Sequence, residues 1–122
     1  MNAPQLLHPV MQDALGLVRT VSPRGTLTST YRSVQEQARL RRAYELGRSQ
    51  FPAEQPGRST HHTGLAFDYV VREGARSPQQ LELGRWWESI GGVWAGPRDP
   101  VHFQHPAARD ALAAGLVRQR WW

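Results

Sequence analysis

The segment STHHTGLAFD runs from Ser59 to Asp68 and places His61 seven positions before Asp68, across a Thr-Gly turn signal. The apolar run 65–71 predicts a strand, in which successive side chains point to opposite faces. An unbroken strand would therefore direct two residues seven positions apart to opposite faces. A bend at Gly64 can bring the imidazole back beside the carboxylate. We therefore expect His61 and Asp68 to contribute to one site.

A second motif, DPVHF at residues 99–103, supplies another carboxylate and another histidine. The chain contains no cysteine, so a zinc site must be built from imidazole and carboxylate ligands. A catalytic zinc ion usually has three protein ligands and keeps one further position open for water. We predict that His61, Asp68 and His102 hold one Zn²⁺ ion. In this interpretation Asp99 acts on the water bound to the ion, although an aspartate before proline is also a common turn residue.

Together the two motifs resemble those of a known family. The pattern S-x-H-x-x-G-x-A-x-D at residues 59–68, followed by D-x-x-H-F at residues 99–103, is similar to the VanY-type D-alanyl-D-alanine carboxypeptidase and L-alanyl-D-glutamate peptidase family of zinc peptidases. The resemblance extends from about Thr28 to His105, which is most of the chain. It implies an α+β fold of the hedgehog/DD-peptidase type, in which a small antiparallel sheet carries the zinc ligands and about four helices pack around it.

The segment GGVW at residues 91–94, ahead of DPVHF, is similar to the Gly-Gly-x-Trp of phage L-alanyl-D-glutamate peptidases. Carboxypeptidases of the VanY type more often carry glutamate in the base position, where this chain has Asp99. The resemblance therefore favours the phage endolysin-like branch, which cleaves the L-alanyl-D-glutamate bond of peptidoglycan stem peptides. Two alternatives stay open: a D-alanyl-D-alanine carboxypeptidase, and a non-catalytic cell-wall-binding or virion structural module.

The segment YRS at residues 31–33, with Gln37, also looks like the family, in which an arginine at this point reaches the active cleft. A guanidinium there can bind a substrate carboxylate or the oxyanion that forms during attack. By this resemblance Arg32 is predicted to bind substrate and to assist catalysis, and Gln37 to bind substrate. The competing interpretation is that Arg32 is one of fifteen arginines and lies at the surface.

Two further candidates for substrate binding adjoin His61. The resemblance places Ser59 near the metal site, where its hydroxyl would form a hydrogen bond, although a plain turn serine is an equal interpretation. His62 follows His61 directly, and only one of two neighbouring histidines normally faces a metal ion. Because the family spacing selects His61, His62 is expected at the edge of the cleft or at the surface, as a candidate substrate contact.

Periodicity, capping residues and turn signals predict the secondary structure that carries these motifs. We expect helices at residues 9–20, 34–46, 77–90 and 106–120, and strands at residues 26–30, 65–71, 93–95 and 101–104. The segment 48–58, which contains two prolines and a glycine, is predicted to be a loop that borders the cleft. The two tryptophans at the end of the chain are expected to pack back onto the domain.

Length and charge limit the remaining possibilities. At 122 residues the chain is predicted to form one domain, 1–122, and we expect a monomer. The formal net charge of +5 suits a polyanionic partner such as a cell wall, an anionic membrane surface or nucleic acid, but a solvated basic surface explains it equally well. The arginines are scattered and no nucleic-acid recognition motif is visible, so peptidoglycan is the expected partner and nucleic acid is not.

The first seventeen residues have neither a basic beginning nor a continuous apolar stretch, so no secretory signal is predicted. No segment is apolar enough to predict a transmembrane helix. Because peptidoglycan lies outside the cytoplasm, we expect a protein that is made in the cytoplasm and reaches the wall after release, as a phage lysin, or on a virion.

Overall fold

The computed structural model describes residues 3–50 and 52–117. Within these residues a four-stranded antiparallel sheet has the strand order β1-β2-β4-β3. The strands are β1 (Thr26–Ser29), β2 (Ala66–Val70), β3 (Val93–Trp94) and β4 (His102–Gln104). The helices are α1 (Pro9–Val21), α2 (Val34–Glu45), α3 (Pro78–Ser89) and α4 (Ala108–Ala113), with two short 3₁₀ helices, η1 (Pro4–Leu6) and η2 (Thr60–Thr63). The predicted α+β fold, with a small antiparallel sheet and four helices, is confirmed.

The two central strands separate an apolar face from a polar one. Phe67 and Tyr69 of β2 are fully buried in the core, whereas Asp68 and Val70 of the same strand line a cleft. This is the alternation that a strand of period two predicts. In the register of the sheet Asp68 lies opposite His102 of β4. The strand pairing therefore brings two residues of the predicted metal site together although they are far apart in sequence.

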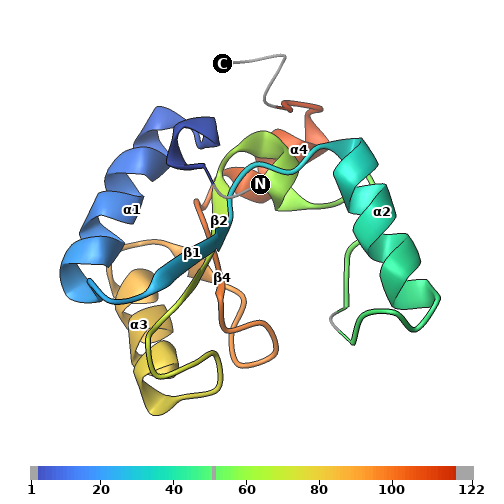
Figure 1. Ribbon diagram of the computed structural model, residues 1–122. Helices are drawn as coiled ribbons and strands as arrows, with labels where there is room; N and C mark the ends of the chain where they lie inside the picture. Colours follow the sequence, from blue (N-terminus) through green and yellow to red (C-terminus); the bar gives the residue numbers. More distant parts are fainter. Residues whose placement is uncertain (1–2, 51, 118–122) are drawn as a thin grey trace.

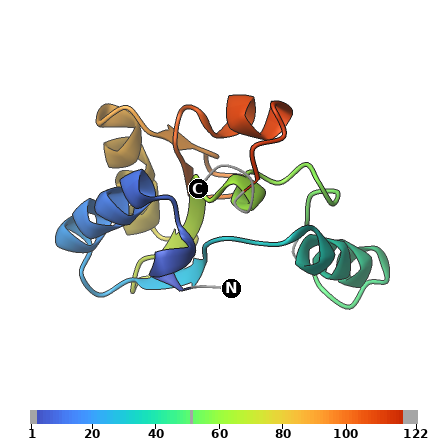
Figure 2. The ribbon, with the colours of Figure 1, turned by 90° about the horizontal axis from the view of Figure 1, so that it is seen from above.

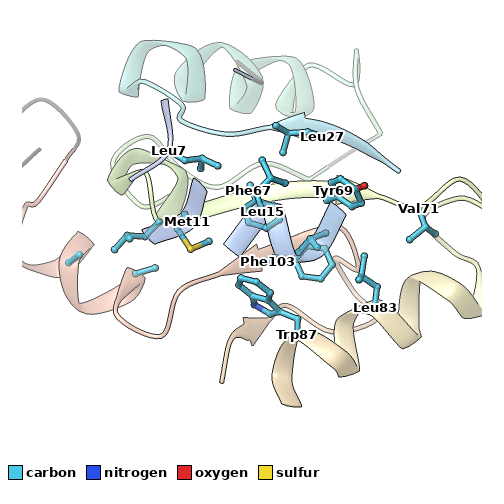
Figure 3. Close-up of a cluster of buried hydrophobic side chains, with 14 residues drawn as sticks. Leu7, Met11, Leu15, Leu27, Phe67, Tyr69, Val71, Leu83, Trp87 and Phe103 are labelled. Atoms are coloured by element: carbon cyan, nitrogen blue, oxygen red, sulfur yellow. The ribbon is translucent and has the colours of Figure 1, made fainter. Parts of the chain in front are cut away.

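Aromatic side chains fill the space between the sheet and helix α3. The ring of Phe67 stacks on that of Phe103 at 5.8 Å between centroids, and the indole of Trp87 meets both rings edge-on. Figure 3 shows Trp87 and Leu83 projecting from α3 toward these strands. Burying a side chain of this size stabilises the fold by roughly 1.5–3 kcal/mol. The face of the sheet opposite the cleft is therefore held by dense apolar packing.

Helix α2 is placed differently from the other helices. Figures 1 and 2 both show it displaced to one side of the sheet, away from α1 and α3. Gln37 is its one buried residue, and the apolar residues Val34, Leu40 and Tyr44 each remain 37–47% exposed. The apolar spacing correctly predicted a helix, but α2 does not bury those side chains in the core.

The last helix is shorter than predicted. The pattern predicted a helix over 106–120, but α4 ends at Ala113. Gly115 adopts a φ of +74°, in the left-handed region that commonly terminates helices. The expected packing of the two C-terminal tryptophans lies outside the described residues. Among the residues that the structure describes, no helix is long and apolar enough to span a bilayer.

Candidate metal centre

Three side chains predicted to bind metal meet at one point. His61 comes from η2, Asp68 from β2 and His102 from β4, and one potential ligand atom of each lies within 4.8 Å of the others. The Asp68 Oδ1 atom is 3.2 Å from both Nε2 of His61 and Nδ1 of His102. The predicted bend lies at Gly64, whose φ of +76° turns the chain from η2 into β2. This turn places His61 beside Asp68.

The other nitrogen of each imidazole has a partner that fixes the ring. Nδ1 of His61 lies 2.6 Å from the carbonyl oxygen of Thr30, which can only accept a hydrogen bond, so this nitrogen carries the proton. Nε2 of His102 lies 2.7 Å from Oε1 of Gln104, which makes it the donor in that pair. These assignments rest on the hydrogen-bond geometry. They leave the lone pairs of His61 Nε2 and His102 Nδ1 facing the Asp68 carboxylate.

With both imidazoles neutral, the three facing atoms of the site are all acceptors. Such an arrangement requires a cation, either a proton on an imidazole or a metal ion. Two imidazoles and one carboxylate, each oriented by a partner behind it, match the ligand set of catalytic zinc sites. Within residues 3–50 and 52–117, this is the one His/Cys/Asp/Glu group with a geometry that can hold a metal. The residues present therefore fit Zn²⁺.

The pKa shifts of Asp68 and His102 also indicate that the site favours a bound cation. Burial opposes ionisation of Asp68, but the neighbouring imidazoles of His61 and His102 outweigh it and hold the pKa of Asp68 well below its ordinary value. Burial lowers the pKa of His102, yet the hydrogen bond and charge of Asp68 raise it above its ordinary value. A proton and a metal ion therefore compete for the same nitrogen of His102.

Asp99 lines the same cleft as the three residues, in the turn that leads into β4. The amide of Asp99 donates to the carbonyl of Gly96 at 3.2 Å, and the amide of His102 donates to the carbonyl of Asp99 at 3.1 Å. Asp99 keeps part of its surface exposed, but its partial burial, and then the charge of Asp68, raise the pKa of its carboxyl above the ordinary value. A carboxylate that holds a proton more readily than a free aspartate suits proton transfer at neutral pH.

Arg32 and Gln37 lie together on the α2 side of the cleft. The Arg32 guanidinium donates to Oε1 of Gln37 and to Oγ of Ser29, each at 2.9 Å, and lies 3.8 Å from Asp68 Oδ2. Gln37 is fully buried and its amide nitrogen donates to the carbonyl of Glu54 at 2.7 Å. Arg32 therefore reaches the site, and Gln37 fixes the guanidinium while it fastens the 48–58 loop to α2.

Ser59 and His62 have different surroundings from one another. Ser59 lines the cleft, and its hydroxyl accepts a hydrogen bond from the amide of His61 at 3.2 Å, which caps η2. His62 is only 1% exposed, with Nδ1 donating to the carbonyl of Arg32 at 2.6 Å and Nε2 accepting from the amide of Gly57 at 3.1 Å. The prediction of a cleft-edge or surface histidine is therefore wrong for His62.

The local helix explains this correction. In a 3₁₀ helix successive side chains point about 120° apart, so neighbouring histidines in η2 cannot both face the metal site. His61 faces Asp68, and His62 turns beneath the backbone of Arg32. Burial lowers the pKa of His62, and its two hydrogen bonds suit the neutral ring. His62 supports the segment that carries Arg32 instead of touching the cleft.

Sequence reasoning missed two residues that orient His102. Oε1 of Gln104 accepts hydrogen bonds from both the His102 ring and the hydroxyl of Thr60, the latter at 3.0 Å. Strand alternation could have identified Gln104, because residues two apart on β4 share a face. No comparable signal identified Thr60, whose position depends on the course of η2.

The comparisons with known proteins agree with this geometry. The family model described as VanY, D-alanyl-D-alanine carboxypeptidase, matches residues 9–91, more than half of the chain. The match ends before Asp99 and His102, which the structure places in the same cleft as His61 and Asp68. A search of curated proteins found no match to this sequence.

Several solved structures share the fold. The L,D-carboxypeptidase DacB from Streptococcus pneumonia aligns with a TM-score of 0.60 at 20% identity, over 91% of this chain and 73% of that one. The D,D-dipeptidase VanXYg, in complex with a D-Ala-D-Ala phosphinate analogue, aligns with a TM-score of 0.66 at 18% identity, over 93% of this chain and 57% of that one. A VanY D,D-pentapeptidase in complex with Zn(II) gives 0.53 at 19% identity, over 91% and 78%.

The fold and the site define a class of protein. An antiparallel sheet presents a histidine and an aspartate, and a short helix presents a second histidine, to a cleft that also contains a second acid. Proteins of this class are zinc-dependent peptidoglycan peptidases. The chain belongs to the VanY family of D-alanyl-D-alanine carboxypeptidases.

Proposed function

We propose that this chain is an L-alanyl-D-glutamate endopeptidase that hydrolyses peptidoglycan stem peptides at a zinc site. The observation that carries the proposal is the convergence of His61, Asp68 and His102 within 4.8 Å, in a cleft that Asp99 also lines. Two imidazoles and a carboxylate bind zinc and leave a position open, and a separate acid is available for proton transfer. An enzyme of this kind would meet its substrate at the cell wall.

The shape of the cleft supports cleavage within a chain. The cleft has a volume of about 960 Å³ and its lining includes residues from all four strands of the sheet. Asp68 and His102 lie on the two central strands, whereas Thr28 and Val93 line the cleft from the two edge strands. A peptide can therefore extend to both sides of the metal site, as an endopeptidase requires. The resemblance of GGVW and DPVHF to phage L-alanyl-D-glutamate peptidases supports the same choice.

The residues of the site divide the reaction between them. Zinc, when bound, lowers the pKa of a coordinated water and polarises a carbonyl oxygen. Asp99 would take the proton from the attacking water, whose oxygen forms the new bond to the carbonyl carbon. The guanidinium of Arg32 would stabilise the negative charge that develops on the carbonyl oxygen. As the carbon–nitrogen bond breaks, Asp99 would return the proton to the departing amine.

Replacing Asp99 tests this assignment. Asp99→Ala should keep zinc, because all three ligands remain, and should lower the rate of stem-peptide cleavage by at least about 100-fold. Asp110→Ala, at an exposed position of α4, is the control and should keep both zinc and rate. Zinc content is measured by metal analysis and cleavage on purified peptidoglycan. If the parent and both variants bind zinc and none cleaves, the chain is a wall-binding or structural module.

The family description favours one alternative, a D-alanyl-D-alanine carboxypeptidase. The products of digestion separate the two activities. An endopeptidase at the L-alanyl-D-glutamate bond creates a new amino-terminal D-glutamate, whereas a carboxypeptidase releases free D-alanine. Mass spectrometry and amino-terminal labelling of the digested peptidoglycan distinguish these products, and release of D-alanine alone would overturn the endopeptidase proposal.

A further inference from the structure

Gln80 is a fully buried polar residue near the start of α3, and it does not line the cleft. Its Oε1 accepts from the amide of Val71 at 2.8 Å, and its Nε2 donates to the carbonyls of Tyr69 at 3.0 Å and Pro100 at 2.9 Å. The side chain thus binds the end of β2 to the residue that follows Asp99. A buried amide keeps its place only when its polar atoms are satisfied, and here all of these contacts go to backbone.

The carbonyl of Pro100 accepts a second hydrogen bond from another side chain. The indole Nε1 of Trp94 in β3 donates to it at 2.9 Å. The indole lies against α3 at Gly84, where a side-chain carbon would come within 2.1 Å of the ring. Helix α3 therefore approaches Pro100 both directly through Gln80 and through the indole that rests on it. We call these two donors, Gln80 Nε2 and Trp94 Nε1, the Pro100 clamp.

The clamp acts on Pro100, the residue that directly follows Asp99 and lies two positions before β4, the strand that carries His102. Proline has no amide hydrogen, so its carbonyl is the only backbone group through which hydrogen bonds can hold this residue. On either side the turn is closed by the amide of Asp99 on Gly96 and by the amide of His102 on Asp99. With both lone pairs of its carbonyl engaged, Pro100 cannot rotate without breaking hydrogen bonds at a buried amide.

We infer that Gln80 and Trp94 are positioning residues that hold the Asp99 carboxylate in place for proton transfer. This inference rests on the proposed function, in which Asp99 moves the proton. Neither clamp residue lines the cleft, and the side-chain hydrogen bonds of both go to backbone carbonyls and amides outside His61, Asp68 and His102. Loss of the clamp should therefore change the placement of Asp99 while leaving the three metal ligands intact.

Two variants and one control test the clamp. Gln80→Leu removes all three side-chain hydrogen bonds, Trp94→Phe removes only the second donor to Pro100, and Gln79→Leu changes an exposed neighbour of the same type. The first readout is hydrogen exchange at the amides of Asp99 and His102 in the metal-free protein. Exchange at these amides should accelerate by about fivefold or more for each hydrogen bond removed. The amide of Leu15 in α1 reports global unfolding and should not change in Trp94→Phe.

The second readout is peptide cleavage per zinc-loaded molecule. In both clamp variants kcat should fall by about tenfold or more with KM within about twofold, because a misplaced base slows proton transfer without weakening substrate binding. Zinc content should match the parent. If Gln80→Leu does not fold, Trp94→Phe, which loses a single N–H donor, decides the question alone.

The outcomes separate this inference from the proposed function. Unchanged exchange at Asp99 and His102, or unchanged kcat despite faster exchange, overturns the positioning role. A fall in zinc content that accounts for all of the lost activity also overturns it, because the clamp would then support the ligands and not the base. A parent protein that cleaves no stem peptide overturns the proposed function, and unchanged exchange in the variants would then overturn the clamp separately.

Discussion

Helices α3 and α2 are both amphipathic in sequence, yet they are attached to the sheet by different forces. Four residues of α3 are buried, including Leu83 and Trp87, whereas Gln37 is the only buried residue of α2. The α3 side packs against the strands that carry Asp68 and His102. The α2 side adjoins Arg32 and is held by hydrogen bonds. The strands that carry two of the metal ligands are therefore held by apolar packing. Arg32, the group proposed to contact substrate, is held by hydrogen bonds.

The largest difference between the two sides should appear in stability. Trp87→Ala on α3 removes a ring that contacts Phe67 and Phe103 and that donates hydrogen bonds to the carbonyls of Val93 and Gln104. We expect the free energy of unfolding to fall by about 3–5 kcal/mol, as for other buried large-to-small changes. Tyr44→Ala on α2, where the residue is 37% exposed, should cost less than about 1 kcal/mol.

Urea unfolding of the two variants beside the parent measures this difference. Equal losses of stability in the two variants would show that α2 contributes as much packing as α3, and the contrast between the helices would then fail.

The same contrast explains what could be predicted from sequence. Alternation along β2 placed Phe67 and Asp68 on opposite faces, because burial of one face enforces a period of two. The bend at Gly64 could be predicted because glycine permits the left-handed conformation. The exposed position of α2 could not be predicted, since Leu40 and Tyr44 have the spacing of a core face. Spacing shows that a helix has an apolar side, but not what lies opposite that side.

His61 and His62 show a second limit. Both are histidines in the same turn, and their local sequence does not determine which one faces the strand. The family spacing selected His61, while the fate of His62 depends on its partners, the backbone of Arg32 and Gly57. Arg32 is thirty positions away in sequence, and Gly57 lies in a loop without regular spacing. The burial of His62 therefore follows from tertiary structure and could not be predicted from the local sequence.

Acid should empty the metal centre while the packing on the α3 side remains. Below the pKa of His102, which Asp68 raises above its ordinary value of 6.5, a proton occupies the nitrogen that faces the metal site. Zinc affinity should then fall about tenfold per pH unit for each proton that zinc must displace. Zinc affinity between pH 7 and pH 5 is measured with a competing chelator, and circular dichroism reports the fold.

The stability of the metal-free protein should depend on pH in the opposite sense to zinc affinity, and be greater at low pH. Because the folded-state pKa of His102 is raised, its ion pair with Asp68 stabilises the metal-free protein fully below the ordinary value of 6.5 and is lost as pH rises through the raised value. Helical signal at pH 5 should therefore survive loss of zinc. Unfolding that coincides with zinc release would show that the metal, and not the apolar core, holds the two central strands together.

Two helical glycines provide a sharper test of packing on the α3 side. Gly16→Ala in α1 has open space around the new carbon, so it should stabilise the protein by about 0.5–1 kcal/mol through helix propensity. Gly84→Ala in α3 should instead destabilise by about 1–3 kcal/mol, because the new carbon would overlap the indole of Trp94. Thermal unfolding of both variants measures the two signs. Stabilisation by both substitutions would show that the indole moves aside easily.

A clear change in function with only a modest change in stability is expected on the α2 side. Gln37→Leu removes the acceptor of the Arg32 guanidinium and the donor to the carbonyl of Glu54. The free energy of unfolding should fall by about 1–2 kcal/mol. The loss is limited to this range because an apolar side chain still fills the space. Cleavage, measured as kcat/KM, should fall by about 10- to 100-fold because Arg32 loses the partner that fixes its orientation. Zinc content should stay at the parental level, because the ligands lie on other elements.

Gln35→Leu, at an exposed position two residues earlier on α2, controls for the added apolar side chain and should leave both stability and kcat/KM unchanged. Retention of full kcat/KM by Gln37→Leu would mean that Ser29 and Asp68 alone hold Arg32 in its working position, since these are its remaining partners. Loss of zinc from Gln37→Leu would mean that the α2 side supports the metal centre itself. In that case the division between a packed side that holds the metal and a hydrogen-bonded side that contacts substrate would not hold.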